Sequence, residues 1–132
     1  MTNYREALEA AGATLLDFGE FGTWEGNWIA HLADGRFVEG AFGSCSGCDA
    51  FESEFGLLDY GCDAHCRPNE ICGECAKKAA NYARRLAIFG QTYLDSAEDY
   101  ESIRQRFLEQ SEWDYDAKEA VAWLDRAMEE TR

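Results

Sequence analysis

The chain has 132 residues, a formal net charge of −14 and six cysteines, and 46% of its residues are hydrophobic. A length of this order predicts a single domain over residues 1–132, with enough apolar side chains for a packed core. The excess of acidic side chains argues against direct nucleic-acid binding, because phosphate contacts depend on lysine and arginine. We also expect no membrane span, since no apolar run approaches about 18 residues, and no signal peptide, since the start Met1–Glu6 lacks a basic region and an apolar stretch. These features predict a cytoplasmic protein.

Residues 14–42 have the composition of β-strands, because aromatic and β-branched residues alternate with glycines there. Asp34-Gly35 stands between two such runs and predicts a hairpin with a type I′ turn. A second turn is expected at Trp24-Glu25-Gly26-Asn27, with Thr14–Phe18 as a further strand. The segment therefore predicts a three-stranded antiparallel meander.

Helical patterns lie on both sides of this meander. Asn3 and Glu6 have capping-box spacing and predict a helix over 3–12, and a short helix is expected at Ala50–Phe55. Three helices are expected after residue 76: one to about Leu94, one opened by a box of Ser96 and Asp99, and one opened by Asp114 or Asp116. The last has an apolar stripe formed by Ala117, Ala120, Val121, Leu124, Ala127 and Met128.

The predicted fold class is α+β, with a small three-stranded antiparallel sheet and a helical C-terminal half. Residues 1–44 would form the first helix and the meander, and residues 76–132 the three helices. Between them, residues 45–75 form a connector that contains all six cysteines and only one basic residue, Arg67.

The cysteines of this connector have the spacing of metal ligands. Cys45-Ser46-Gly47-Cys48 and Cys72-Gly73-Glu74-Cys75 are C-x-x-C pairs, and Cys62-Asp63-Ala64-His65-Cys66 lies between them. The two-residue spacer lets both thiolates of a tight turn reach one tetrahedral ion. A structural zinc site is therefore the favoured interpretation. Disulfides, a redox dithiol, an iron–sulfur cluster and buried free thiols are the alternatives.

Two ligand sets are compatible with the spacing. One consists of Cys45, Cys48, Cys72 and Cys75. The other is more compact and combines Cys62, and either His65 or Cys66, with Cys72 and Cys75. Cys72 and Cys75 belong to both sets, and their position before a helix favours the thiolate form. As a non-ligand, His65 would be an exposed loop residue, and His31 is interpreted as a structural residue of a strand.

No catalytic residue is predicted, since the chain has no G-x-S-x-G, no glycine-rich phosphate loop and no His-Glu-x-x-His. Four tryptophans are many for this length. Trp28 is expected in the core of the sheet. Trp113 and Tyr115 flank Asp114 in a connection, where packing against the core or a helix cap is favoured over contact with a protein partner.

Three stretches resemble a family: Phe21-Gly22-Thr23-Trp24-Glu25-Gly26-Asn27-Trp28, Gly43-Ser44-Cys45-Ser46-Gly47-Cys48-Asp49-Ala50-Phe51-Glu52 and Phe89-Gly90-Gln91-Thr92-Tyr93-Leu94. In this order they resemble small acidic proteins of unknown function encoded by bacteriophages and some bacteria. Relatives usually have Tyr-Gln-Gly-Asp-Trp where this chain has Trp-Glu-Gly-Asn-Trp. The resemblance implies a host-cell cytoplasm and assigns no activity to any residue.

The leading functional hypothesis is a non-enzymatic accessory protein, stabilised by structural zinc and encoded by a phage, that binds a host protein. The first alternative is an acidic nucleic-acid mimic that inhibits a DNA-binding host defence enzyme, in which carboxylates would stand in for phosphates. The second alternative is an enzyme, either a thiol-redox protein or a metal-dependent hydrolase.

Overall fold

The computed structural model describes residues 2–43, 49–55 and 73–131. Its elements are α1 (Thr2–Ala10), β1 (Leu15–Gly22), β2 (Gly26–Leu32), β3 (Phe37–Phe42), α2 (Ala50–Phe55), α3 (Gly73–Leu94), α4 (Tyr100–Gln110) and α5 (Tyr115–Glu130). Within these ranges, one three-stranded sheet is combined with a helical C-terminal half, so the predicted α+β class is confirmed. Most of the connector 45–75 lies outside the described residues.

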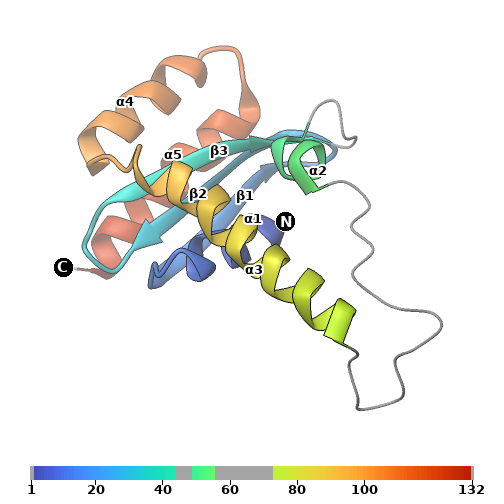
Figure 1. Cartoon of the computed structure of the whole chain (residues 1–132). Helices are drawn as coiled ribbons and strands as arrows, with labels where there is room; N and C mark the ends of the chain where they lie inside the picture. Colours follow the sequence, from blue (N-terminus) through green and yellow to red (C-terminus); the bar gives the residue numbers. More distant parts are fainter. Residues whose placement is uncertain (1, 44–48, 56–72, 132) are drawn as a thin grey trace.

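The sheet is an antiparallel meander in the order β1-β2-β3, with β2 in the centre (Figure 1). The hairpin predicted at Asp34-Gly35 is present, but its loop has three residues. Leu32 N–H donates to the Arg36 carbonyl, and Gly35 N–H, at φ +94°, donates to the Leu32 carbonyl, both at 2.9 Å. Such a loop, with a glycine in the left-handed region, replaces the expected two-residue type I′ turn. The β1–β2 turn comprises residues 23–25, slightly earlier than predicted.

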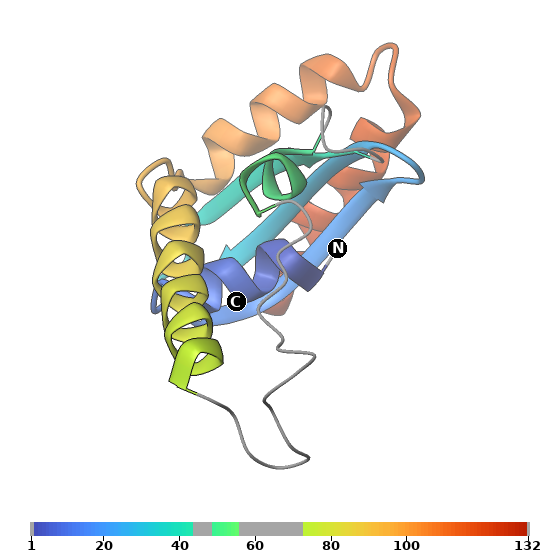
Figure 2. The same cartoon turned by 45° about the vertical axis from the view of Figure 1, so that its right-hand side comes forward.

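Helices cover both faces of the sheet, as Figures 1 and 2 show. Alternate residues of β2 enter the two cores: Trp28 and Ala30 belong to the cluster that includes residues of α1, α2 and α3, and Ile29 to the cluster that includes residues of α4 and α5. Trp28 is fully buried, as predicted. His31 is also buried and its ring stacks on Phe37, with 4.3 Å between centroids, which fits its interpretation as a structural residue.

Helices α1 and α3 cross at a point where the two backbones are in contact. A Cβ atom added to Gly90 of α3 would lie 2.0 Å from the carbonyl oxygen of Ala7 in α1. Only glycine fits this position, because any side chain would push the helices apart. The crossing places Tyr4 of α1 beside Phe89 and Tyr93 of α3, at centroid distances of 6.1 and 6.0 Å.

The helix starts differ in detail from those predicted. Asp99, not Ser96, is the N-cap of α4, and its side chain accepts a hydrogen bond from Ser102 N–H. Asp114 is the N-cap of α5, which is the first of the two predicted choices. Helix α1 begins at Thr2, so Asn3 lies within it and not at its cap. In the described part of the chain, no helix combines the length and apolar character needed to cross a bilayer.

Candidate functional site

The predicted metal ligands fall almost entirely outside the part of the chain that the structure describes. This applies to Cys45, Cys48, Cys62, His65, Cys66 and Cys72. Cys75 is the third residue of α3, so the predicted helix start beside the second C-x-x-C pair is confirmed at the level of the backbone. Among the described residues, no group of three or more histidine, cysteine or acidic side chains could hold a metal.

The described residues on either side of the first C-x-x-C pair meet at one buried carboxylate, that of Asp49. Its Oδ2 atom accepts a 3.0 Å hydrogen bond from Gly43 N–H, and its Oδ1 atom accepts a 2.9 Å bond from Phe51 N–H. Asp49 therefore ties the residue that precedes the segment 44–48 to the start of α2, and it is only 1% exposed. The ends of this cysteine-containing segment are held together by the folded core.

Tyr4 completes this anchor from α1. Its hydroxyl donates a 2.6 Å hydrogen bond to Asp49 Oδ1 and accepts a 3.2 Å bond from Phe51 N–H. Burial, reinforced by the hydrogen bond to the Asp49 carboxylate, raises the pKa of Tyr4 well above its usual value. The phenol therefore stays neutral throughout the physiological pH range and can donate its hydrogen bond to the Asp49 carboxylate.

This anchor was missed at the level of sequence. The available signal was Asp49 itself, an aspartate directly before the predicted helix Ala50–Phe55 and hence a candidate N-cap. Nothing local pointed to Tyr4, because its partner lies 45 positions further along the chain.

The segment 56–72 also has described residues on both sides that contact each other. The ring of Phe55, the last residue of α2, lies 5.5 Å from the rings of Tyr82 and Phe89 of α3. Arg85 of α3 donates a 2.7 Å hydrogen bond to the Glu54 carbonyl and places its guanidinium 5.2 Å from the Phe55 ring centroid. Helix α2 is thereby fixed to the middle of α3, while the first turns of α3 extend beyond the sheet (Figure 1).

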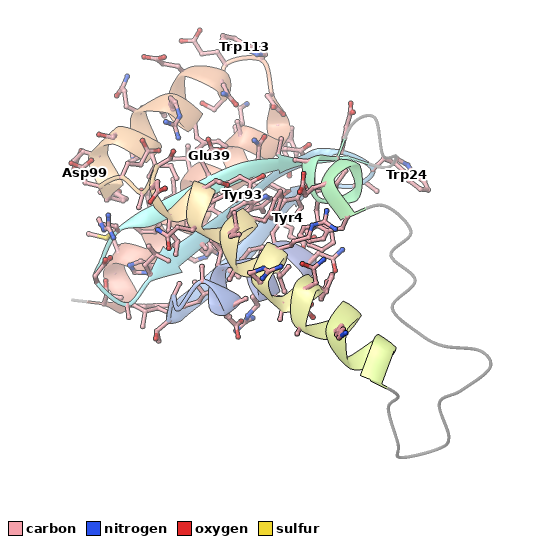
Figure 3. The ribbon with its side chains drawn as sticks, in the orientation of Figure 1. Tyr4, Trp24, Glu39, Tyr93, Asp99 and Trp113 are labelled. Carbon is pink, nitrogen blue, oxygen red and sulfur yellow. The ribbon has the colours of Figure 1, made fainter. Side chains whose placement is uncertain are left out.

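A second feature is a set of exposed aromatic side chains. Trp24 lies in the β1–β2 turn, and Trp113 and Tyr115 lie at the connection between α4 and α5. They are 78%, 76% and 71% exposed, respectively, the highest values among the large hydrophobic residues described as exposed. The favoured prediction, that Trp113 and Tyr115 pack on the core or a cap, is therefore wrong. Figure 3 shows Trp24 and Trp113 projecting outward from different parts of the fold.

The partly buried carboxylate of Glu39 in β3 serves the packing of α4. Burial raises its pKa, while the guanidinium of Arg106 in α4, 3.3 Å away, acts in the opposite direction. Arg106 also pairs with Glu98, which precedes α4. This network joins α4 to the edge strand of the sheet.

Comparisons with models of protein families, with curated proteins and with solved structures find no match. The resemblance to phage-encoded acidic proteins stays a prediction. A function for this chain must be argued from its own residues, of which the Asp49 anchor and the exposed aromatic side chains are the most informative.

Proposed function

We propose that this chain is a non-enzymatic accessory protein that binds another protein. The observation that carries this proposal is the exposure of Trp24, Trp113 and Tyr115 on turns of the fold. When a partner covers exposed aromatic side chains of this size, a large apolar area is removed from water. Such side chains dominate the binding energy of many interfaces. Trp24 lies on the β1–β2 turn, and Trp113 and Tyr115 lie on either side of the N-cap of α5, so all three would be available to a partner.

The second part of the proposal is that zinc stabilises the connector. It is supported by the C-x-x-C spacing of Cys45 with Cys48 and of Cys72 with Cys75. The anchor at Asp49 also supports it, because the ends of the first cysteine segment are already joined and less chain entropy is lost when a metal binds. The metal would have a structural role, and the aromatic side chains would contact the partner.

The partner in this proposal is a host protein, and the chain would act in the cytoplasm of a phage-infected cell. This rests on the resemblance of the Gly43–Glu52 stretch to phage-encoded proteins. Direct contact with nucleic acid is not part of the proposal, because the net charge of −14 repels phosphates.

Two measurements test the two parts separately. Metal analysis of protein purified without added zinc should give about one equivalent, as expected for one closed four-ligand site. Affinity capture from a bacterial lysate should retain a specific protein with the native chain and lose it with a W24A/W113A variant. The matched control is L16A/I88A, which truncates two exposed apolar side chains on β1 and α3. Equal capture by all three proteins would refute the assignment of the aromatic residues.

A further inference from the structure

A groove of about 470 Å³ is lined in part by residues that adjoin the exposed aromatic residues in the sequence. It is lined by three parts of the fold: the β1–β2 turn, the end of β3 and the start of α5. The lining residues are Glu25, Gly26, Ala41, Phe42, Asp114 and Asp116. The pairing of Gly26 with Phe42 brings the first two parts together, and α5 lies beside them.

The groove is acidic, and within the described residues the one hydrogen bond to its carboxylates is the cap of α5, in which Asp114 accepts the Asp116 N–H at 3.0 Å. Glu25, Asp114 and Asp116 take part in none of the ion pairs there, in which arginines pair with other acids. The larger hollow at the opposite end of the sheet is different, because its Asp34 lies 2.9 Å from its own Arg36. No arginine or lysine of the described residues pairs with the groove carboxylates, so they are available there to cationic groups of a partner.

Each exposed aromatic residue is a sequence neighbour of a groove carboxylate. Trp24 precedes Glu25, and Trp113 and Tyr115 stand on either side of Asp114. Aromatic faces attract guanidinium and ammonium groups, and an adjacent carboxylate strengthens this preference. Figure 3 shows Trp24 and Trp113 at separate places on the fold, so one ligand that contacts both would have to bridge the β1–β2 turn and the connection between α4 and α5.

The two turns that present these side chains are held by backbone contacts. A Cβ atom at Gly26 would lie 1.8 Å from the Phe21 carbonyl oxygen, so the β1–β2 turn closes tightly. At the other turn, the N–H groups of Trp113 and Asp114 donate to the Gln110 carbonyl at 3.2 and 3.0 Å. Turns ordered before binding lose little conformational entropy when a partner docks.

We infer that this groove binds an extended, arginine-rich segment of a protein partner. The guanidinium groups would pair with Glu25, Asp114 and Asp116, and their planar faces would stack on Trp24, Trp113 and Tyr115. Arginine fits better than lysine, because its guanidinium forms bidentate bonds to carboxylates and stacks on aromatic rings. The inference rests on the proposed protein-binding function and specifies the chemistry of the partner.

The test uses the full-length protein and a fluorescein-labelled ten-residue peptide of alternating arginine and serine, titrated at 150 mM salt and followed by anisotropy. The control peptide has glutamine in place of every arginine. The variant E25Q/D114N/D116N should weaken binding of the arginine peptide about tenfold or more, from the loss of three charge pairs. Asn at 114 keeps an oxygen acceptor for the α5 cap. W24A/W113A should weaken binding to a similar extent.

The matched control is E101Q/E129Q/E130Q, which removes the same charge from exposed positions on α4 and α5. It should change the affinity less than about threefold, since distant exposed charges are screened at this salt concentration. An equal loss in both triple variants would overturn the inference, because binding would then reflect net charge alone. Equal binding of the glutamine peptide would also overturn it.

Three further outcomes bear on this inference and on the proposed function. Capture of a host protein that depends on Trp24 and Trp113, without groove-dependent peptide binding, would keep the function and refute the arginine-rich partner. A dimer that W24A/W113A converts to a monomer in light scattering would assign the groove to a second copy and also refute it. If the peptide binds as expected but no protein is captured, the groove inference is supported. The proposal of a protein partner in that lysate is then contradicted.

Discussion

The hydroxyl of Tyr4 in α1 donates a 2.6 Å hydrogen bond to the buried carboxylate of Asp49, 45 positions further along the chain. This bond joins the first helix of the protein to the residue that directly follows the first C-x-x-C pair. The same carboxylate accepts the N–H groups of Gly43 and Phe51. The Asp49 side chain thus links α1, the residue after β3 and the start of α2.

We expect Tyr4→Phe to lower the free energy of unfolding by about 1–3 kcal/mol, because Asp49 loses a charge-assisted hydrogen bond in a buried position. Asp49→Ala should cost more, since Gly43 N–H also loses its acceptor and Phe51 N–H keeps only the longer bond to the Tyr4 hydroxyl. Urea denaturation followed by circular dichroism measures both. Tyr115→Phe is the matched control, because its hydroxyl group is on an exposed residue. If Tyr4→Phe and Tyr115→Phe have the same midpoint, the anchor has no energetic role.

Gly90→Ala should destabilise the protein by about 1–3 kcal/mol, despite the higher helix propensity of alanine. The added Cβ would lie 2.0 Å from the Ala7 carbonyl oxygen, so α1 and α3 must separate. Thermal unfolding of Gly90→Ala and of the exposed control Ile88→Ala tests this. A Gly90→Ala variant as stable as the native chain would show that the two helices can shift without cost.

His31 should make stability depend on pH. Burial lowers its pKa from the ordinary 6.5, although the carboxylates of Asp17 and Asp34 act in the opposite direction. The unfolded chain then binds a proton at a higher pH than the folded protein does, so stability falls as the pH drops below about 6.5. A His31→Phe variant, which keeps a ring to stack on Phe37, should lack this component. Urea midpoints from pH 7.5 to 5 compare the two, and parallel curves would contradict the prediction.

Local pattern was enough for much of the fold. The stripe in α5 was predictable because Ala120 and Leu124 recur at helical spacing, and both are buried. The short helix Ala50–Phe55 and the hairpin at Asp34-Gly35 were also predictable from local sequence, since caps and turns depend on a few neighbouring residues.

Long-range contacts were not predictable from local pattern. The contact of Gly90 with Ala7 depends on how two helices cross, and a glycine inside a helical pattern does not indicate its neighbour. For Trp113, a contact was predicted that the fold does not make: the side chain was expected to pack, but it is 76% exposed. Whether a large side chain is covered depends on tertiary structure, which periodicity in one segment does not report.

The metal proposal yields a prediction that separates the two ligand sets. Cys75→Ser should abolish zinc binding under both, and the loss of metal should lower the thermal midpoint because zinc binding to such sites contributes folding free energy. Cys45→Ser should remove the metal only if Cys45, Cys48, Cys72 and Cys75 are the ligands. Cys62→Ser should remove it only in the compact alternative. The measurements are metal content by mass spectrometry and thermal unfolding before and after chelation. Cys45→Ser and Cys62→Ser serve as controls for each other. A Cys75→Ser protein that keeps its full equivalent of zinc would exclude both sets, because Cys75 is common to them.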